Sequence, residues 1–121
     1  MTPPEARTVL VVEDEGLLRL DAAESLRDAG FEVLEAADAC EALETVERRD
    51  DIGVVFTDIN MPGMDGMELA RRVRRSHPGM GLLLTSGAMR VDPRDIPDHG
   101  AFLSKPYSPD VVASTIRRLL A

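Results

Sequence analysis

The sequence has few of the residues that several common kinds of site and anchor require. Its 121 residues include a single cysteine, which excludes an internal disulfide and favours a reducing, cytoplasmic environment. Aromatic residues make up only 3%, so the core has to be aliphatic. No apolar run approaches the ~20 residues of a membrane-spanning helix, and the first residues lack the apolar stretch of a signal peptide. The net charge of −8 argues against direct binding of DNA or of an anionic membrane.

The sequence does contain a regular alternation of short apolar runs with amphipathic segments. Strands are predicted at residues 8–12, 31–36, 52–57, 81–85 and 100–104. Helices are predicted to begin near residues 15, 38, 65 and 108. Strands that alternate with helices at this spacing indicate an α/β domain, with a mostly parallel sheet covered on both faces.

Two of these segments carry more specific expectations. The apolar residues of the first helix recur at helical spacing: Leu18, Ala22, Leu26 and Ala29. After them Gly30 is expected to end the helix in a left-handed conformation. Between the fourth and fifth strands, Pro93 and Pro97 interrupt a stretch with little apolar periodicity. A short, bent or missing helix is predicted there.

Acidic and other reactive side chains follow the ends of four predicted strands. Glu13 and Asp14 follow the first strand, Asp58 the third, Ser86 the fourth and Lys105 the fifth. Ligands of such sheets bind beyond the carboxyl ends of the strands, so these side chains are expected to share one site. Carboxylates brought that close must take up protons or hold a cation, and hard oxygen ligands suit Mg²⁺. A carboxylate in such a site can attack a phosphoryl group and become an acyl phosphate.

The same motifs resemble the receiver domain of bacterial two-component response regulators. The resemblance is carried by ED at positions 13–14, DINMPGMDG at 58–66, a hydroxyl after the fourth strand and KP at 105–106. It covers roughly residues 8–120, and we expect a loose tail of residues 1–7 before a receiver domain of residues 8–121. The resemblance implies a flavodoxin-like, doubly wound, five-stranded parallel sheet of order 2-1-3-4-5.

The resemblance also assigns roles to individual residues. Asp58 would accept the phosphoryl group, and Lys105 would pair with that group, next to a cis peptide bond to Pro106. Mg²⁺ would be bound directly by Asp14, Asp58 and the backbone carbonyl of Asn60, and through a water molecule by Glu13.

The hydroxyl of the family's conformational switch has two candidates, because Thr85 and Ser86 are adjacent. The family places a small residue directly after this hydroxyl, a place that either Ser86 or Gly87 fills. Spacing from Asp58 favours Ser86. Phe102, three residues before the KP pair, would be the aromatic residue that turns inward when the hydroxyl moves.

The resemblance implies a signalling phosphoacceptor that catalyses only its own phosphorylation and dephosphorylation. Its donor would be a histidine kinase or phosphotransfer protein, and phosphorylation would change the binding of an unknown output protein. The chain would be a stand-alone regulator or a domain of a longer protein. A metal-dependent phosphatase is the alternative, but such enzymes usually have a second acid two residues after the nucleophile, where this chain has Asn60. An adaptor that never carries phosphate is a further alternative, although every side chain needed for phosphorylation is present.

Overall fold

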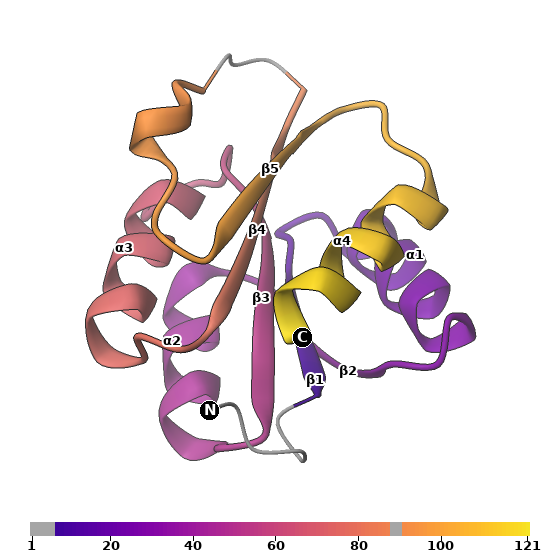
Figure 1. Cartoon of the computed structure of the whole chain (residues 1–121), viewed down its shortest axis with the longest axis horizontal. Helices are drawn as coiled ribbons and strands as arrows, with labels where there is room; N and C mark the ends of the chain where they lie inside the picture. The colour runs from indigo at the N-terminus through magenta and orange to yellow at the C-terminus, as the bar shows by residue number, and fades with distance from the viewer. Residues whose placement is uncertain (1–6, 88–90) are drawn as a thin grey trace.

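The computed structural model describes residues 7–87 and 91–121, so residues 1–6 of the expected tail lie outside the described part. The five strands form one parallel sheet of order β2-β1-β3-β4-β5, as predicted (Figure 1). Their bounds are β1 Thr8–Val12, β2 Glu32–Ala36, β3 Ile52–Asp58, β4 Gly81–Ser86 and β5 Gly100–Ser104.

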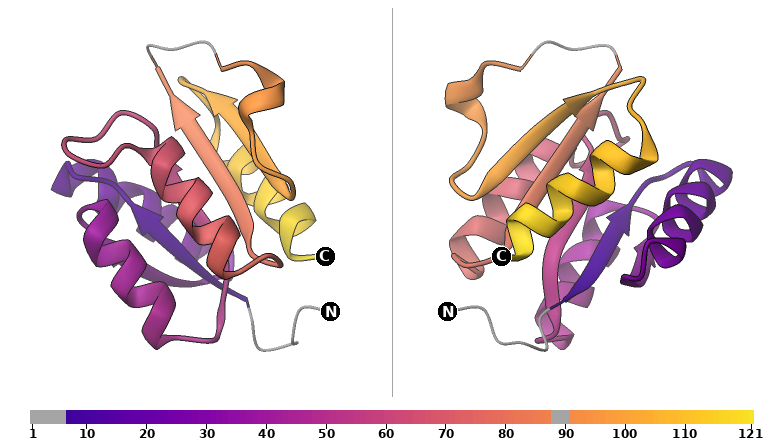
Figure 2. Two further views of the ribbon diagram at one scale, coloured as in Figure 1. Left: turned by 90° about the vertical axis from the view of Figure 1, so that its left-hand side faces the viewer. Right: turned by 45° about the vertical axis from the view of Figure 1, so that its right-hand side comes forward.

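Helices cover both faces of this sheet. Helices α2 and α3 lie together on one face, whereas α1 and α4 cover the other (Figure 2). Their bounds are α1 Gly16–Asp28, α2 Ala39–Arg48, α3 Gly66–Ser76 and α4 Pro109–Leu120. Within the described ranges, none of these helices is long and apolar enough to span a bilayer.

The segment between β4 and β5 contains a single helical turn in its described part, the 3₁₀ turn η1 at Pro93–Asp95. Residues 88–90 of this segment lie outside the described part. Asp92 accepts a hydrogen bond from the backbone N–H of Arg94 and begins the turn. A proline also fits the first turn of a helix, where its missing N–H is not needed. The prediction of a short, irregular helix in this segment is confirmed.

The central strands are buried on both faces, which requires an aliphatic sequence. All five residues of β1 are buried. Because side chains alternate across a strand, Leu10 and Val12 pack toward α2 and α3, whereas Val9 and Val11 pack toward α1 and α4. Parallel sheets covered on both faces consist of such continuous apolar strands. The interior strands therefore hold their carboxyl ends in fixed relative positions.

The helix ends follow the local signals of the sequence. Asp38 and Asp65 accept hydrogen bonds from the backbone N–H groups of Glu41 and Glu68, at 2.8 and 2.9 Å, and so cap α2 and α3. Gly30, with φ of 99°, follows α1 in the left-handed conformation that glycine adopts without strain.

The expected apolar stripe of α1 is partly wrong. Leu26 is buried as expected, but Ala23 is the other buried residue of this helix. Leu18 is 52% exposed. It lines a cavity and does not enter the core.

Candidate functional site

Asp58 and Lys105 meet beyond the carboxyl ends of β3 and β5. The Lys105 Nζ atom donates to Asp58 Oδ2 at 2.8 Å, and the backbone N–H of Asn60 donates to Asp58 Oδ1 at 3.0 Å. The Asp58 side chain is 11% exposed and that of Lys105 is 34% exposed. Burial lowers the pKa of Lys105, but the hydrogen bond and the charge of Asp58 outweigh it, so the pKa is raised overall. The ammonium group is therefore charged at neutral pH.

The backbone around Asp58 is fixed by a close approach from α3. Ile59 donates its N–H to the carbonyl of Thr85 at 2.9 Å and accepts from the N–H of Gly66 at 3.0 Å. A Cβ atom at position 66 would overlap the carbonyl oxygen of Asp58 and come within 2.8 Å of the Cα of Ile59. Only glycine fits there, so the DG pair of the motif lets α3 begin directly against the end of β3.

Glu13 follows β1 and lies half-buried beside Asp58. Its carboxylate accepts from the N–H of Glu15 at 3.0 Å. Burial raises the pKa of Glu13, and Asp14 and Asp58 raise it further, whereas Glu15 and Lys105 act in the opposite direction. Glu13 therefore lies within electrostatic reach of Asp14, Asp58 and Lys105, while Asp14 itself is exposed to solvent.

The donor set of this site fits Mg²⁺. Within residues 7–87 and 91–121, no three His, Cys, Asp or Glu side chains lie close enough to enclose a metal ion by themselves. Mg²⁺ does not need such a cage, because it commonly uses one or two carboxylates together with water and phosphate oxygens. The half-buried acids Glu13 and Asp58 beside the exposed Asp14 match that requirement.

Thr85 and Ser86 point to different neighbours. Ser86 Oγ accepts from the side-chain amide of Asn60 at 2.9 Å, and both hydroxyl residues are buried. Thr85 and Tyr107 line the same cavity beside Asp58, and burial is the main reason that the pKa of Tyr107 is raised. Ser86 is thus connected through Asn60 to the loop that follows Asp58. Phe102 is partly buried against the core under α2 and α3.

A cavity of about 370 Å³ opens beside Asp58 on the face of the sheet covered by α1 and α4. Glu13, Asp58 and Lys105 line one part of it, and Leu18 and Tyr107 line another. The phosphoacceptor candidate therefore faces a space that a reacting group can enter, although its side chain is mostly buried.

The structure thus brings together Glu13, Asp58, Asn60, Ser86 and Lys105, and places Asp14 next to Glu13. The predicted cis bond between Lys105 and Pro106 is confirmed. Sequence reasoning did not identify Gly66 or Tyr107 as parts of the site, nor an arginine that binds the backbone of Glu13. Gly66 had a signal, since a glycine at the first position of a predicted helix indicates a close backbone approach.

Fold and site together define a class of protein: a doubly wound α/β domain with a lysine-paired aspartate among acids at the carboxyl ends of its strands. The model of the response regulator receiver domain family matches residues 9–117, and the chain belongs to this family. It is therefore a receiver domain, the phosphoacceptor module of two-component signal transduction.

Relatives of the chain include both single-domain and longer proteins. It is 38% identical over 117 residues to the sensor kinase CckA of Brucella abortus, covering 93% of this chain and 12% of the kinase. It is 30% identical to the response regulator receiver protein CpdR of the same organism, covering 94% of this chain and 97% of that one. It also spans 26% of the transport regulator DctD of Pseudomonas aeruginosa. The chain thus covers only a minor part of some of these relatives.

Solved structures agree with this assignment. A response regulator receiver protein from Sinorhizobium medicae matches with a TM-score of 0.87 and 31% identity, over 98% of this chain and 97% of that one. The receiver domain of the hybrid histidine kinase CckA matches with a TM-score of 0.80 and 34% identity, over 94% of this chain and 99% of that domain.

Proposed function

We propose that Asp58 is the residue that accepts the phosphoryl group, and that Lys105 neutralises the charge of that group. The observation that carries the proposal is the 2.8 Å contact between Lys105 Nζ and Asp58 Oδ2, at a carboxylate that opens onto a cavity. An aspartate paired in this way could be purely structural. The adjoining acids argue otherwise, because a stabilising ion pair has no need of two further carboxylates beside it.

The reaction is a transfer between nucleophiles. A carboxylate oxygen of Asp58 forms a bond to phosphorus, and the bond between phosphorus and the donor's imidazole nitrogen breaks, leaving the electron pair on that nitrogen. The product is an acyl phosphate. Lys105 then moves its ammonium group from the carboxylate to a phosphoryl oxygen, which requires only rotation of a flexible side chain. The chain thereby assists its own modification and acts on no separate substrate.

We assign the divalent-ion ligands to this same acidic site. Asp14, Asp58 and the backbone carbonyl of Asn60 would bind Mg²⁺ directly, and Glu13 would bind through water. When bound, the ion neutralises phosphoryl oxygens and so lowers the repulsion between two anions. The part of this chain is to hold its carboxylates at the carboxyl ends of β1 and β3.

Phosphorylation would act through Ser86. The Ser86 hydroxyl accepts a hydrogen bond from the amide of Asn60, in the loop after Asp58, and would turn to contact a phosphoryl group on Asp58. Phe102 on β5 would then turn into the vacated space, and the surface formed by β5, α4 and the segment before β5 would change. Thr85 is the weaker candidate for this role, because Ser86 is the hydroxyl that contacts Asn60 in the loop after Asp58.

The donor would be a histidine kinase or a phosphotransfer protein, in keeping with relatives that include a sensor kinase and a receiver protein. We propose the cytoplasm as the compartment, since such donors draw their phosphoryl groups from ATP. The output protein is unidentified, and neither DNA nor a membrane is proposed as a direct partner. The receiver domain would occupy residues 8–121, alone or within a longer protein.

The phosphatase alternative requires an acid two residues after the nucleophile. Asn60 occupies that position, and its amide donates to Ser86, so it supplies no general acid or base. Turnover of external substrates is therefore not proposed.

Intact-mass measurement tests this function. The chain is incubated with Mg²⁺ and a small phosphoryl donor such as acetyl phosphate, beside the D58N variant. Wild type is expected to gain one acid- and base-labile phosphoryl group, and D58N none. Equal labelling of the two proteins would overturn the assignment to Asp58, and catalytic release of phosphate from many substrates would support a phosphatase.

A further inference from the structure

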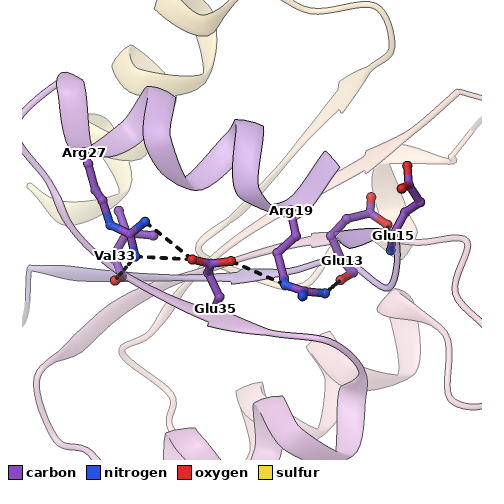
Figure 3. A network of polar contacts seen from close by, with 6 residues as sticks. All are labelled: Glu13, Glu15, Arg19, Arg27, Val33 and Glu35. Atoms are coloured by element: carbon purple, nitrogen blue, oxygen red, sulfur yellow. Dashed lines mark hydrogen bonds and ion pairs between the residues drawn. The ribbon is translucent and has the colours of Figure 1, made fainter. Parts of the chain in front are cut away.

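The backbone that carries the Glu13–Asp14 pair is bound by a side chain from outside the acidic site. Arg19, in the first turn of α1, donates from Nη1 to the backbone carbonyl oxygen of Glu13 at 2.9 Å. The Nε atom of the same guanidinium group lies 3.4 Å from Oε1 of Glu35 on β2. Figure 3 shows Arg19 between these two groups, reaching from the helix across to the loop and the strand.

Glu35 is itself held in place by a second arginine. Arg27 Nη1 and Nη2 each lie 3.4 Å from Glu35 Oε2, and Nη2 also donates to the carbonyl of Val33 at 3.1 Å. The Arg19 and Glu35 side chains are 24% and 29% exposed, so their ion pair is screened less than a fully solvated one. Glu35 thus provides Arg19 with a fixed anchor on the neighbouring strand.

The contact with the Glu13 carbonyl determines how the chain leaves β1. The carbonyl of Glu13 and the nitrogen of Asp14 belong to one planar peptide unit, so fixing the carbonyl fixes the plane from which Asp14 departs. The preceding peptide unit is held as well, because the N–H of Glu13 donates to the carbonyl of Ala36 at 3.1 Å. With both units held, the Cα atom of Asp14, from which its carboxylate extends, is fixed relative to the end of β1.

We propose that Arg19, anchored by Glu35, is a positioning residue of the acidic site. It orients the peptide between Glu13 and Asp14 so that the Asp14 carboxylate lies on the side of Asp58, where one divalent cation can contact both. This inference rests on the proposed function, since the cation belongs to it. Arg19 itself touches neither the cation nor the phosphoryl group.

A purely electrostatic role for Arg19 predicts the opposite effect of its removal. A guanidinium group near the site repels a divalent cation, so loss of its charge alone would tighten cation binding. Loss of an orienting contact would weaken it, typically by about tenfold or more for groups that position metal ligands. The direction of the change therefore distinguishes the two roles.

The test is a titration of unphosphorylated, ¹⁵N-labelled protein with MgCl₂, followed by NMR through the backbone amides of Glu13 and Asn60. R19M is expected to bind Mg²⁺ about tenfold more weakly than wild type. R19K is expected to bind weakly as well, because a single ammonium group cannot bridge the Glu13 carbonyl and Glu35.

The matched control is R27M. It removes the positive charge of another arginine that pairs with Glu35, and Arg27 does not contact Glu13. It is expected to lose much less affinity than R19M, because Arg19 keeps its own contact with the Glu13 carbonyl. At saturating Mg²⁺, R19M is expected to approach the wild-type phosphorylation rate.

Binding by R19M as tight as wild type, or tighter, would overturn the proposal, as would an equal loss in R27M. E35Q keeps the shape of its side chain and weakens only the anchor, so it supplies an intermediate loss should R19M fail to fold. Unchanged Mg²⁺ affinity in E35Q would contradict the role of the anchor. Failure of the wild-type protein itself to bind Mg²⁺ would instead count against the proposed function.

Discussion

Lys105 is the only lysine in the chain, and its ammonium group reaches a carboxylate on a strand that is not its neighbour. β4 lies between β3 and β5, so the 2.8 Å contact from Nζ to Asp58 Oδ2 spans the carboxyl end of the middle strand. Such an ion pair lacks the full screening of water and contributes more than an exposed pair. Transfer of Lys105 to a phosphoryl oxygen would break this contact, so the position of the Lys105 ammonium group would indicate whether Asp58 is phosphorylated.

Gly66 allows a prediction at the same scale. In G66A the new methyl group meets the backbone of Asp58 and Ile59, neither of which is a flexible side chain. The end of β3 or the start of α3 must shift, and we expect the variant to lose about 1–3 kcal/mol of unfolding free energy. Phosphorylation of Asp58 is expected to slow as its carboxylate moves from Lys105. Urea unfolding and single-turnover labelling measure the two effects.

G79A is the matched control for that variant. Gly79, in the loop after α3, has no atom within 4 Å of the place where a methyl group would lie, and it does not adopt a positive φ. The same substitution there is expected to leave stability and labelling near wild type. Equal behaviour of G66A and G79A would show that the close approach at position 66 has no consequence.

At the scale of the elements, the ends of the strands opposite the site are held by their own polar contacts. Asp51, just before β3, accepts from the Thr8 hydroxyl at 3.0 Å and pairs with Arg49 at 2.6 Å. The hydrogen bond from Arg49 holds the pKa of Asp51 at about 2. These contacts join the first residue of β1 to the start of β3.

Stability should therefore depend on the charge of Asp51 at acid pH. Its pKa is lower in the folded chain than the ordinary value near 3.9, so its contribution is complete above about pH 4. The contribution is lost as the pH falls through about 2. We expect D51N to be less stable than wild type by about 1 kcal/mol at pH 7, a figure reduced for partial exposure, and the difference to shrink as the pH falls toward 2.

Urea unfolding of both proteins across this pH range measures the difference. D50N provides the control, since its side chain is exposed and enters none of these contacts in the described structure. If the difference between D51N and wild type stayed constant from pH 7 to pH 2, the charge of Asp51 would not be its source.

The elements were predictable where their signals are local. Asp38, Asp65 and Gly30 fix helix ends through contacts within a few residues, and an apolar run is enough to predict a buried strand. The stripe of α1 was predicted only in part, because Leu18 lines the cavity beside Asp58 and does not pack into the core. Periodicity gives the face of a helix but not the length over which that face is covered.

At the scale of the whole molecule, the order of the strands in the sheet determines which strand-end side chains come together in the site. With β1 and β3 adjacent, the acids at their ends lie side by side, and β5 brings the lysine from the far side of β4. Strand ends alone therefore predicted Glu13, Asp58 and Lys105 as one site. The roles of Arg19 and Glu35 were not predicted. Their contacts join a helix, the loop after β1 and the neighbouring strand β2, and no sequence spacing indicates which residues of these three segments come into contact.

The central claim is that Asp58 accepts a phosphoryl group and that Lys105 moves to it. Because the chain has one lysine, protein labelled with ¹⁵N-lysine gives a single side-chain Nζ resonance in an NMR spectrum. Addition of Mg²⁺ and acetyl phosphate is expected to shift this resonance in wild type and to leave that of D58N at its position with Mg²⁺ alone. A phosphorylated wild-type protein whose Nζ resonance has not moved, or an equal shift in D58N, would contradict the account.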